Sequence, residues 1–181
     1  ISNVGAQVHW YDREKRRFVE DREWAKRVSR NWDRETVEQV AASLGLRTQA
    51  ALEQRIGKAS YFLDGHDPEK IANAFRDAEV AVEVVSSHGL YLDILASGIG
   101  KHAAVLHVAD RLGMTQAKVV VAGDSGNDRA MLRACPRPII VGNWSDGLGD
   151  DPALSHAYKA SATHAAGILE GVQHYRDAGG W

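Results

Sequence analysis

The sequence predicts an α/β protein in which a small α+β layer is joined to a doubly wound layer of parallel strands and helices. The first sign is an alternation of strand and helix patterns over residues 59–95, which suits a helix pair laid on an antiparallel sheet. The second is a repeating order of strand, loop and helix from Leu90 onward. Within it, residues 119–122 and 138–141 are unbroken apolar runs, as expected for parallel strands buried on both faces.

Length and composition agree with a folded chain that has its own core. The 181 residues are 44% hydrophobic and 25% charged, which suits one domain or a small core with an inserted cap. The net charge of 22 − 24 = −2 gives no support for nucleic-acid binding. No apolar run approaches the ~20 residues that span a bilayer, so we expect no membrane partner. Cys135 is the single cysteine, which favours a cytoplasmic, reducing compartment without an intrachain disulfide.

The beginning of the chain has the pattern of a strand that is entered without a lead-in. Residues 4–10 alternate in polarity, and the first residue is Ile1 rather than methionine. We therefore expect these residues to belong to the middle of a longer polypeptide, and the sequence leaves the cause of this start open.

Helical spacing follows in a charged region that extends from residue 11 to about residue 56. Trp24, Val28 and Trp32 recur every four residues, and Val37, Val40, Ala41 and Leu44 continue an apolar stripe after Asp33. Asp33 is a suitable N-cap for the second helix, and Gly45 a suitable stop.

The remaining elements are predicted in chain order from the same kinds of signal. Asp67 and Pro68 open a helix between two strand patterns. The predicted strands cover residues 59–63, 80–85, 90–95, 119–122 and 138–141, and the predicted helices cover residues 68–76, 101–112 and 164–175.

The strongest functional signal directly follows the most apolar predicted strand. Residues 123–128 read Gly-Asp-Ser-Gly-Asn-Asp, which places Asp124 and Asp128 at the carboxyl end of a buried strand, where open α/β sheets bind ligands. Gly123 and Gly126 permit a tight turn with positive φ, so both carboxylates could enter one crevice. Such oxygen ligands suit Mg²⁺. The alternative is a polar turn that caps a helix over residues 127–133, and the clustering of acids and glycines favours the metal loop.

A second signal is Lys101, which follows Ser97-Gly98-Ile99-Gly100 at the start of a predicted helix. A glycine-containing loop that opens a helix presents backbone N–H groups to an anion, and a lysine adds a positive charge. The alternative is a solvated surface lysine, although its charge opposes the helix dipole.

These two signals together resemble the last two motifs of haloacid dehalogenase-like phosphatases. Further segments are similar to sucrose-6-phosphate phosphatase within that superfamily, namely residues 4–7, 32–35, 53–55, 58–64, 92–95 and 162–170. The similarity covers essentially the whole chain. It implies a doubly wound haloacid dehalogenase-like (Rossmannoid) core, N-terminally truncated, with an inserted α+β cap: residues 1–11 and 93–181 as a partial core and residues 12–92 as the cap.

The resemblance also implies roles for individual residues. Asp124 would be a direct Mg²⁺ ligand, and Asp128 would hold the metal or its waters. Lys101 would contact the transferring phosphoryl group, and Asn127 would orient the substrate or a neighbouring catalytic group. In the cap, the expected sugar contacts are Gln54, Lys58 and Tyr61, with a solvated cap surface as a nearly equal alternative.

The implied function is Mg²⁺-dependent hydrolysis of a sugar phosphate, sucrose-6-phosphate first, through an aspartyl-phosphate. The attacking aspartate of this superfamily stands on the first core strand, so we expect it in a segment before Ile1 and expect residues 1–181 alone to be inactive. Two alternatives stay open. One is a non-catalytic sugar-phosphate-binding C-terminal domain of a sucrose-phosphate synthase-like protein, and the other is a phosphatase for another phosphorylated sugar.

Overall fold

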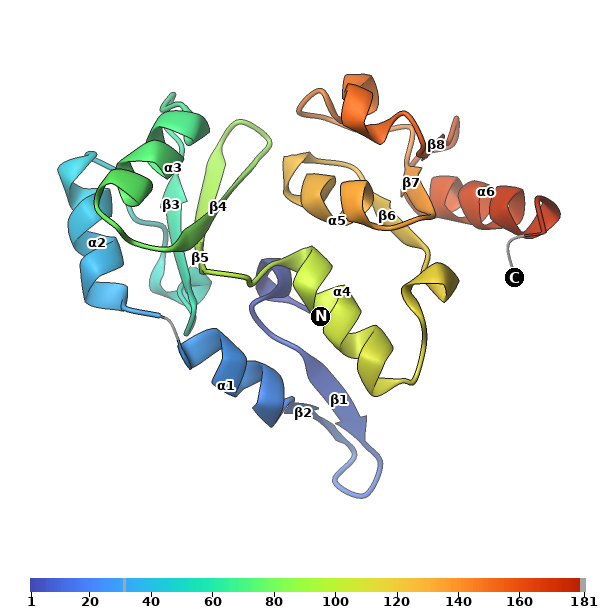
Figure 1. Cartoon of the computed structure of the whole chain (residues 1–181), viewed down its shortest axis with the longest axis horizontal. Helices are drawn as coiled ribbons and strands as arrows, with labels where there is room; N and C mark the ends of the chain where they lie inside the picture. The colour runs from blue at the N-terminus through green and yellow to red at the C-terminus, as the bar shows by residue number, and fades with distance from the viewer. Residues whose placement is uncertain (31, 180–181) are drawn as a thin grey trace. The chain divides into compact units, whose positions relative to one another are not determined.

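The computed structural model describes residues 1–30 and 32–179, and its elements follow one another as drawn in Figure 1. The chain divides into two compact units, Ile1–Ala104 and Val105–Trp181, with the division inside helix α4 (Lys101–Arg111). None of the helices in the described ranges has both the length and the apolar character needed to cross a lipid bilayer.

The first unit opens with a short 3₁₀ turn and a β-hairpin. The predicted strand over residues 4–10 is wrong in its first half, because Asn3–Gly5 form the turn and β1 begins only at His9. Strand β1 (His9–Asp12) pairs antiparallel with β2 (Arg17–Glu20), which interrupts the region predicted as helical. The hairpin turn is favoured locally because the Lys15 N–H donates to Asp12 Oδ1 at 3.0 Å.

Both predicted helices of this region form, although Trp32, predicted in the helical spacing of the first, lies outside it. Helix α1 spans Arg22–Arg30 and buries Trp24 and Val28, and helix α2 spans Arg34–Ser43. Asp33 caps α2 as predicted, since its carboxylate accepts from the Thr36 N–H. Gly45 follows the end of α2 with φ +70°, which confirms it as the stop.

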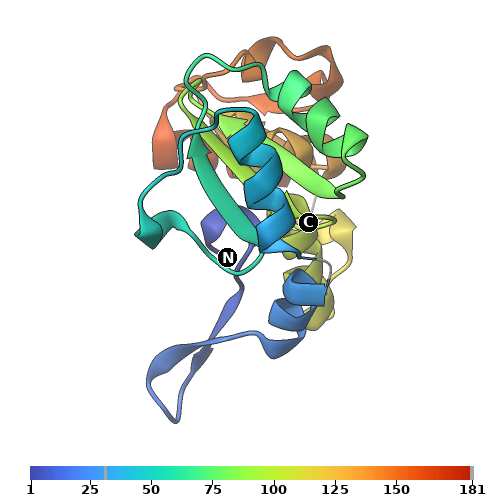
Figure 2. The same ribbon diagram turned by 90° about the vertical axis from the view of Figure 1, so that its left-hand side faces the viewer.

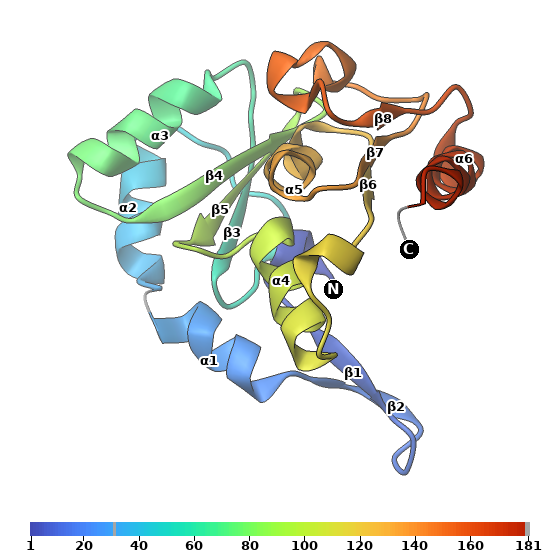
Figure 3. The ribbon, with the colours of Figure 1, turned by 45° about the vertical axis from the view of Figure 1, so that its right-hand side comes forward.

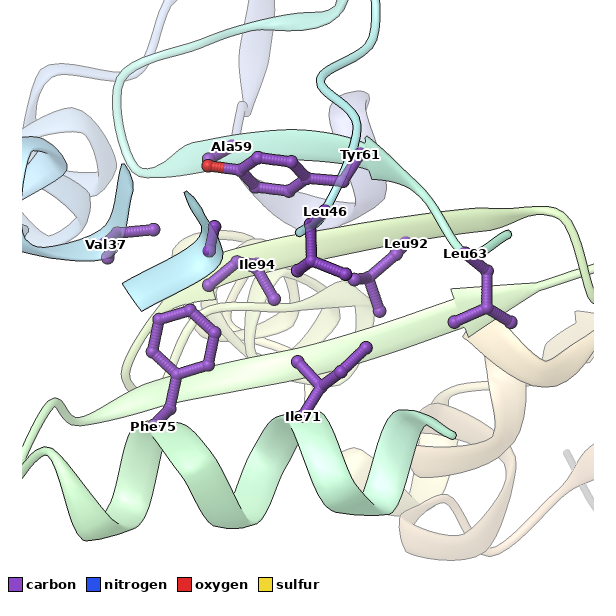
Figure 4. Packing of buried hydrophobic residues seen from close by; sticks show 10 residues of the cluster. Val37, Leu46, Ala59, Tyr61, Leu63, Ile71, Phe75, Leu92 and Ile94 are labelled. Atoms are coloured by element: carbon purple, nitrogen blue, oxygen red, sulfur yellow. The ribbon is translucent and has the colours of Figure 1, made fainter. Parts of the chain in front are cut away.

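An antiparallel sheet with two helices on one face makes up the α+β layer. The strands are ordered β3 (Lys58–Phe62), β5 (Tyr91–Ala96), β4 (Val82–Ser87), and α2 and α3 (Pro68–Asp77) cover one face (Figure 2). The core between helices and sheet consists of Val37, Ala41, Leu46, Ala59, Tyr61, Leu63, Ile71, Phe75, Leu92 and Ile94 (Figure 4). The strand residues of this core are alternate residues, because every second residue of a strand faces the same side of the sheet.

Strand β5 contains the predicted boundary between the two domains. It pairs along its whole length with β3 and β4, so the predicted boundary at residue 93 falls inside a strand of the α+β sheet. The assignment of residues 12–92 to a cap and of the rest to a core stays a prediction.

The second unit is a small parallel sheet covered by helices on both faces. Its strand order is β6 (Val121–Gly123), β7 (Pro138–Ile140), β8 (Tyr158–Lys159). Helices α5 (Arg129–Ala134) and α6 (His164–Asp177) lie on opposite sides of this sheet (Figure 3). The core on the α5 side contains Val121, Met131, Leu132, Cys135, Ile140, Leu148 and Leu154, and the core on the other side contains Ile139, Val141 and Ala160. Neighbouring residues of β7 therefore enter different cores, as a doubly wound layer requires.

Helix α6 is tied to the end of the sheet by the carboxylate of Glu170. This carboxylate accepts from the backbone N–H groups of Ser161 and Ala162 at 3.0 and 2.9 Å and from the Tyr158 hydroxyl at 2.8 Å. These bonds, the one from Ser161 N–H first, lower the pKa of Glu170 from 4.5 to about 2. Because hydrogen bonding favours the ionised form in the folded state, the carboxylate stabilises the fold only while it is charged.

The substitution Glu170→Gln tests this attachment through its pH dependence. The folded-state pKa is depressed, so the stabilisation is fully present above the unfolded value of 4.5 and is lost as pH falls toward about 2. We expect the difference in free energy of unfolding between wild type and Glu170→Gln to be largest above pH 5 and to shrink steadily below it. Urea unfolding at a series of pH values measures this, with Glu69→Gln as a matched control; a difference that does not change with pH contradicts the assignment.

Candidate functional site

Residues 123–128 form the acidic loop, whose first residue, Gly123, is also the last residue of β6. It turns directly from the strand into a 3₁₀ turn at Gly126–Asp128, and Asp128 is 5% exposed. The Asp128 carboxylate closes the loop on itself, since its Oδ2 accepts from the N–H of Asp124 at 3.0 Å and from the N–H of Ser125 at 3.4 Å. Asp128 therefore determines the shape of the loop that carries Asp124.

The two glycines of the acidic loop do not have the backbone conformation predicted for them. Neither Gly123 nor Gly126 is among the described glycines with positive φ, so that expectation is wrong. Gly123 is required by space, because a Cβ on it would lie 2.4 Å from the Asp128 Cβ and 2.7 Å from Asp128 Oδ2. The sequence could not reveal this contact, which depends on where the Asp128 side chain folds back.

The Asp124 carboxylate differs from that of Asp128 in its surroundings. Asp124 is half-buried, and its hydrogen bonds to described residues involve only its backbone, with its carbonyl accepting from the Ser145 N–H at 2.7 Å. Its two carboxylate oxygens accept no hydrogen bond from any described residue. A partly buried carboxylate without protein donors fits a hard cation such as Mg²⁺, which is held by one or two carboxylates plus waters and a phosphate oxygen. In the described ranges, no group of three or more His, Cys, Asp or Glu side chains is arranged to hold a metal ion by itself.

A neighbouring loop contributes a residue that the sequence did not single out. The carboxylate of Asp146 accepts from the Gly126 N–H at 2.9 Å, so a third acid touches the acidic loop. Asn127, predicted to orient the substrate, lies in the same turn, and its Oδ1 accepts from the Ser125 hydroxyl at 3.3 Å. No spacing rule connects Asp146 to residues 20 positions earlier, although its position after a predicted strand was an available signal.

Lys101, the predicted phosphoryl contact, is the first residue of α4 and belongs to the first unit. Its backbone is positioned by the opening turn of the chain: a Cβ on Gly5 would lie 2.2 Å from the Gly100 carbonyl carbon and 2.6 Å from Lys101 N. Gly5 has φ +91°, and its carbonyl accepts from the buried Trp24 Nε1 at 3.0 Å. The turn at residues 3–5 is thereby packed against the start of α4.

The side chain of Gln54, a predicted sugar contact, is engaged within the fold. Its Oε1 accepts from the Ser60 N–H at 2.9 Å, and its Nε2 donates to the Ser60 carbonyl at 2.9 Å and to the Gln49 carbonyl at 3.3 Å. The amide thus bonds to both backbone groups of Ser60 in β3, as a residue of a neighbouring strand would. Its donors and its carbonyl oxygen are all occupied.

Lys58, the second predicted sugar contact, takes part in a buried polar cluster. It is 4% exposed, and its ammonium lies 3.2 Å from Asp93 Oδ1, which also accepts from the Ser60 hydroxyl at 2.6 Å. Asp93 Oδ2 accepts no hydrogen bond from a described residue. The cluster therefore keeps an unused acceptor beside an ammonium with unused N–H donors, which suits the hydroxyl groups of a sugar.

Tyr61, the third predicted sugar contact, lies on the other face of the sheet from Lys58. It is 3% exposed and packs in the core under α2 and α3, where Figure 4 shows its ring beside Leu46 and Ala59. Burial, reinforced by Glu38 and opposed by Arg34, raises the pKa of its hydroxyl. The structure therefore separates Tyr61 from Lys58 and instead joins Lys58 to Asp93 and Ser60.

Comparison with known proteins identifies the family of this chain. Residues 1–176 match the family described as sucrose-6F-phosphate phosphohydrolase. The chain belongs to this family. A probable sucrose-phosphatase of Arabidopsis thaliana is 27% identical over 97% of the chain, and a mannosylfructose-phosphate phosphatase of Agrobacterium fabrum is 29% identical over 97% of it.

Solved structures of the family and superfamily have the same fold. The crystal structure of sucrose-phosphatase from Synechocystis sp. in complex with sucrose and phosphate is 30% identical, with a TM-score of 0.84 over 96% of this chain and 72% of that one. A haloacid dehalogenase-like hydrolase of Bacillus subtilis, 18% identical with a TM-score of 0.60 over 98% of this chain and 67% of that one, agrees in fold. The predicted haloacid dehalogenase-like α/β fold is confirmed.

The chain spans 44% of the length of the Arabidopsis sucrose-phosphatase and 71% of the length of the Agrobacterium enzyme. These relatives are therefore longer than the part that this chain matches. The activity of a whole protein of the sucrose-6F-phosphate phosphohydrolase family is a property of that greater length.

Proposed function

We propose that the complete polypeptide containing residues 1–181 is a Mg²⁺-dependent phosphomonoester hydrolase that converts a sugar phosphate, first of all sucrose-6-phosphate, to the sugar and phosphate. The observation that carries the proposal is the Asp124 carboxylate at the end of β6, which is half-buried and accepts no hydrogen bond from the described residues. Membership in the sucrose-6F-phosphate phosphohydrolase family supports the same chemistry.

In this proposal the residues of the acidic loop hold the cation and the phosphoryl group. Asp124 would bind Mg²⁺ directly, while Asp128 would shape the loop and hold the ion or its waters. Bound Mg²⁺ would offset negative charge on the phosphoryl oxygens. Asn127 would orient the substrate, and Lys101 would donate to a phosphoryl oxygen and so favour the more highly charged transition state.

The attacking group is proposed to be an aspartate outside residues 1–181. Its carboxylate would form a bond to phosphorus while the bond to the sugar oxygen breaks and that oxygen takes a proton. Water would then hydrolyse the aspartyl-phosphate. The proposed location is the cytoplasm, which a chain with the single buried thiol of Cys135 suits.

Recognition of the sugar is proposed to come from the polar cluster of the α+β sheet. Lys58 would donate to a hydroxyl oxygen, and Asp93 Oδ2 would accept from a hydroxyl group. Gln54 would act by holding the β3 edge beside them, and Tyr61 by holding the sheet on its helices. The cluster is partly accessible, since the Asp93 side chain is 15% exposed.

A second candidate substrate class is another phosphorylated disaccharide. The mannosylfructose-phosphate phosphatase of Agrobacterium fabrum supports it, because its identity to this chain, 29%, is as high as that of the plant enzymes. A panel of sucrose-6-phosphate, mannosylfructose phosphate, glucose-6-phosphate and fructose-6-phosphate, assayed with the complete polypeptide with and without EDTA, distinguishes the classes. We expect Mg²⁺-dependent turnover with at least about a tenfold preference in kcat/KM for a disaccharide phosphate. Equal rates on hexose phosphates remove the disaccharide assignment, and no turnover of any substrate favours a non-catalytic sugar-phosphate-binding module.

Within this panel, Asp93→Asn tests the polar cluster. The change removes the free carboxylate oxygen that would accept from a sugar hydroxyl, so we expect KM for the preferred disaccharide phosphate to rise about tenfold. Turnover of p-nitrophenyl phosphate, which has no sugar hydroxyls, should fall much less. Asp77→Asn, an exposed residue of the same unit, is the matched control. Equal losses with both substrates contradict a role in sugar recognition.

A further inference from the structure

The structure points to Asp146 as a positioning residue of the acidic loop. We propose that its carboxylate holds the Gly126 turn in place and thereby raises the affinity of the loop for Mg²⁺, without binding the ion itself. The inference rests on the proposed function, because it concerns the cation that this function requires.

Residues 142–147, here called the bracing loop, follow β7 and contact the acidic loop at two points. The Ser145 N–H donates to the Asp124 carbonyl at 2.7 Å. In the opposite direction, the Gly126 N–H donates to Asp146 Oδ2 at 2.9 Å. The acidic loop is thus attached to the bracing loop on both sides of Ser125.

Asp146 is itself held in an unusual backbone conformation. Its φ is +55°, a region that L residues seldom adopt but that Asp and Asn tolerate better than most. The Arg129 guanidinium donates to the Asp146 carbonyl at 2.7 Å. Arg129 also pairs with Asp151, which Arg133 contacts at 2.7 Å. Helix α5 therefore holds the bracing loop through Arg129. Backbone strain of the kind seen at Asp146 is often found at functional sites.

The contact at Gly126 acts on the turn that carries Asp128, one of the two predicted metal ligands. Gly126–Asp128 form one 3₁₀ turn, and Asp128 Oδ2 in turn accepts from the Asp124 N–H. Without the Asp146 carboxylate this turn could take other positions, and the two acids would have to be ordered when the cation binds. Groups that orient metal ligands in this way commonly change metal affinity by about 10- to 100-fold when they are removed.

Isothermal titration of the complete polypeptide with MgCl₂ tests the proposal with four variants. Asp146→Ala removes the carboxylate, and Asp146→Gly removes it without strain at positive φ. Asp146→Asn keeps an oxygen that can accept from Gly126, and Asp150→Ala removes an exposed acid four residues away. We expect the Kd for Mg²⁺ to rise about tenfold in the Ala and Gly variants, to stay within about threefold in Asp146→Asn, and to be unchanged in Asp150→Ala.

The outcomes distinguish a failure of the Asp146 role from a failure of the proposed function. If the wild type binds Mg²⁺ and the Ala and Gly variants bind it as tightly, the role of Asp146 is overturned while the proposed function stands. If Asp146→Asn weakens binding as much as Asp146→Ala, charge rather than the bond to Gly126 is responsible, and the positioning role is also overturned. If the wild type does not bind Mg²⁺ at all, the proposed function itself fails. Thermal melting of each variant, expected to stay near that of Asp150→Ala, separates loss of binding from loss of folding.

Discussion

Replacing Asp124 by Asn in the complete polypeptide is expected to lower kcat/KM for the sugar phosphate by at least about 100-fold. The side chain keeps its shape but loses the negative charge that would hold Mg²⁺. The carboxylate oxygens accept no hydrogen bond from a described residue, so the substitution leaves no donor of the fold without its acceptor. The free energy of unfolding in the absence of Mg²⁺ should therefore change little, and the loss should be specific to activity and to Mg²⁺ binding.

The matched control for this experiment is Asp150→Asn. Asp150 is exposed in the same unit, and the substitution changes the net charge by the same amount. Steady-state kinetics over a range of Mg²⁺ concentrations, together with urea unfolding, give the two quantities needed. Turnover by Asp124→Asn close to that of Asp150→Asn would falsify the assignment of Asp124 as the metal ligand.

The second large effect is expected at Gly5, where Gly5→Ala should reduce the free energy of unfolding by about 2–4 kcal/mol. Two costs add. A Cβ at φ +91° is strained by itself. The same Cβ would also lie 2.2 Å from the Gly100 carbonyl carbon, and neither backbone can move away as a flexible side chain could. Because the displaced backbone leads into Lys101, we also expect a loss of activity in the complete polypeptide.

Gly65→Ala separates the two costs. Gly65 has φ +81°, and a Cβ there would meet no atom within 4 Å. This variant should therefore show only the conformational cost of about 1–2 kcal/mol. The difference between the two variants in urea unfolding measures the contact between Gly5 and Gly100, and equal losses would show that this contact is unimportant.

Local signals in the sequence were sufficient for these helix ends and for the position of the acidic loop. Asp33 and Asp67 cap α2 and α3, and Gly45 follows the end of α2, because each depends on atoms only a few residues apart. The loop after β6 was identified in the same way, since a strand, two acids and two glycines are adjacent in the chain. The hairpin of β1 and β2 was missed because its turn residues, Asp12 and Lys15, give only a weak sequence signal. The helical apolar spacing that follows them is stronger.

The residues predicted to contact the sugar show what a sequence pattern can and cannot predict. Strand alternation already implies that Lys58 and Tyr61 point to opposite faces of β3, and the structure places Tyr61 in the core. What alternation could not supply is the partner of Lys58. Asp93 lies opposite Ser60 only because β5 pairs with β3 in that register, and this pairing crosses more than 30 residues of chain.

By itself, then, the sequence determined the fold class, the helix caps and the position of the acidic loop after β6, all of which depend on residues close together in the chain. Only the tertiary structure decided why Gly123 must be glycine, which acid accompanies Lys58, and that Asp146 touches Gly126. The physical reason is that these contacts are only a few ångströms long but join residues that strand order, register and side-chain direction bring together. A small change in any of these would give the same local sequence different neighbours.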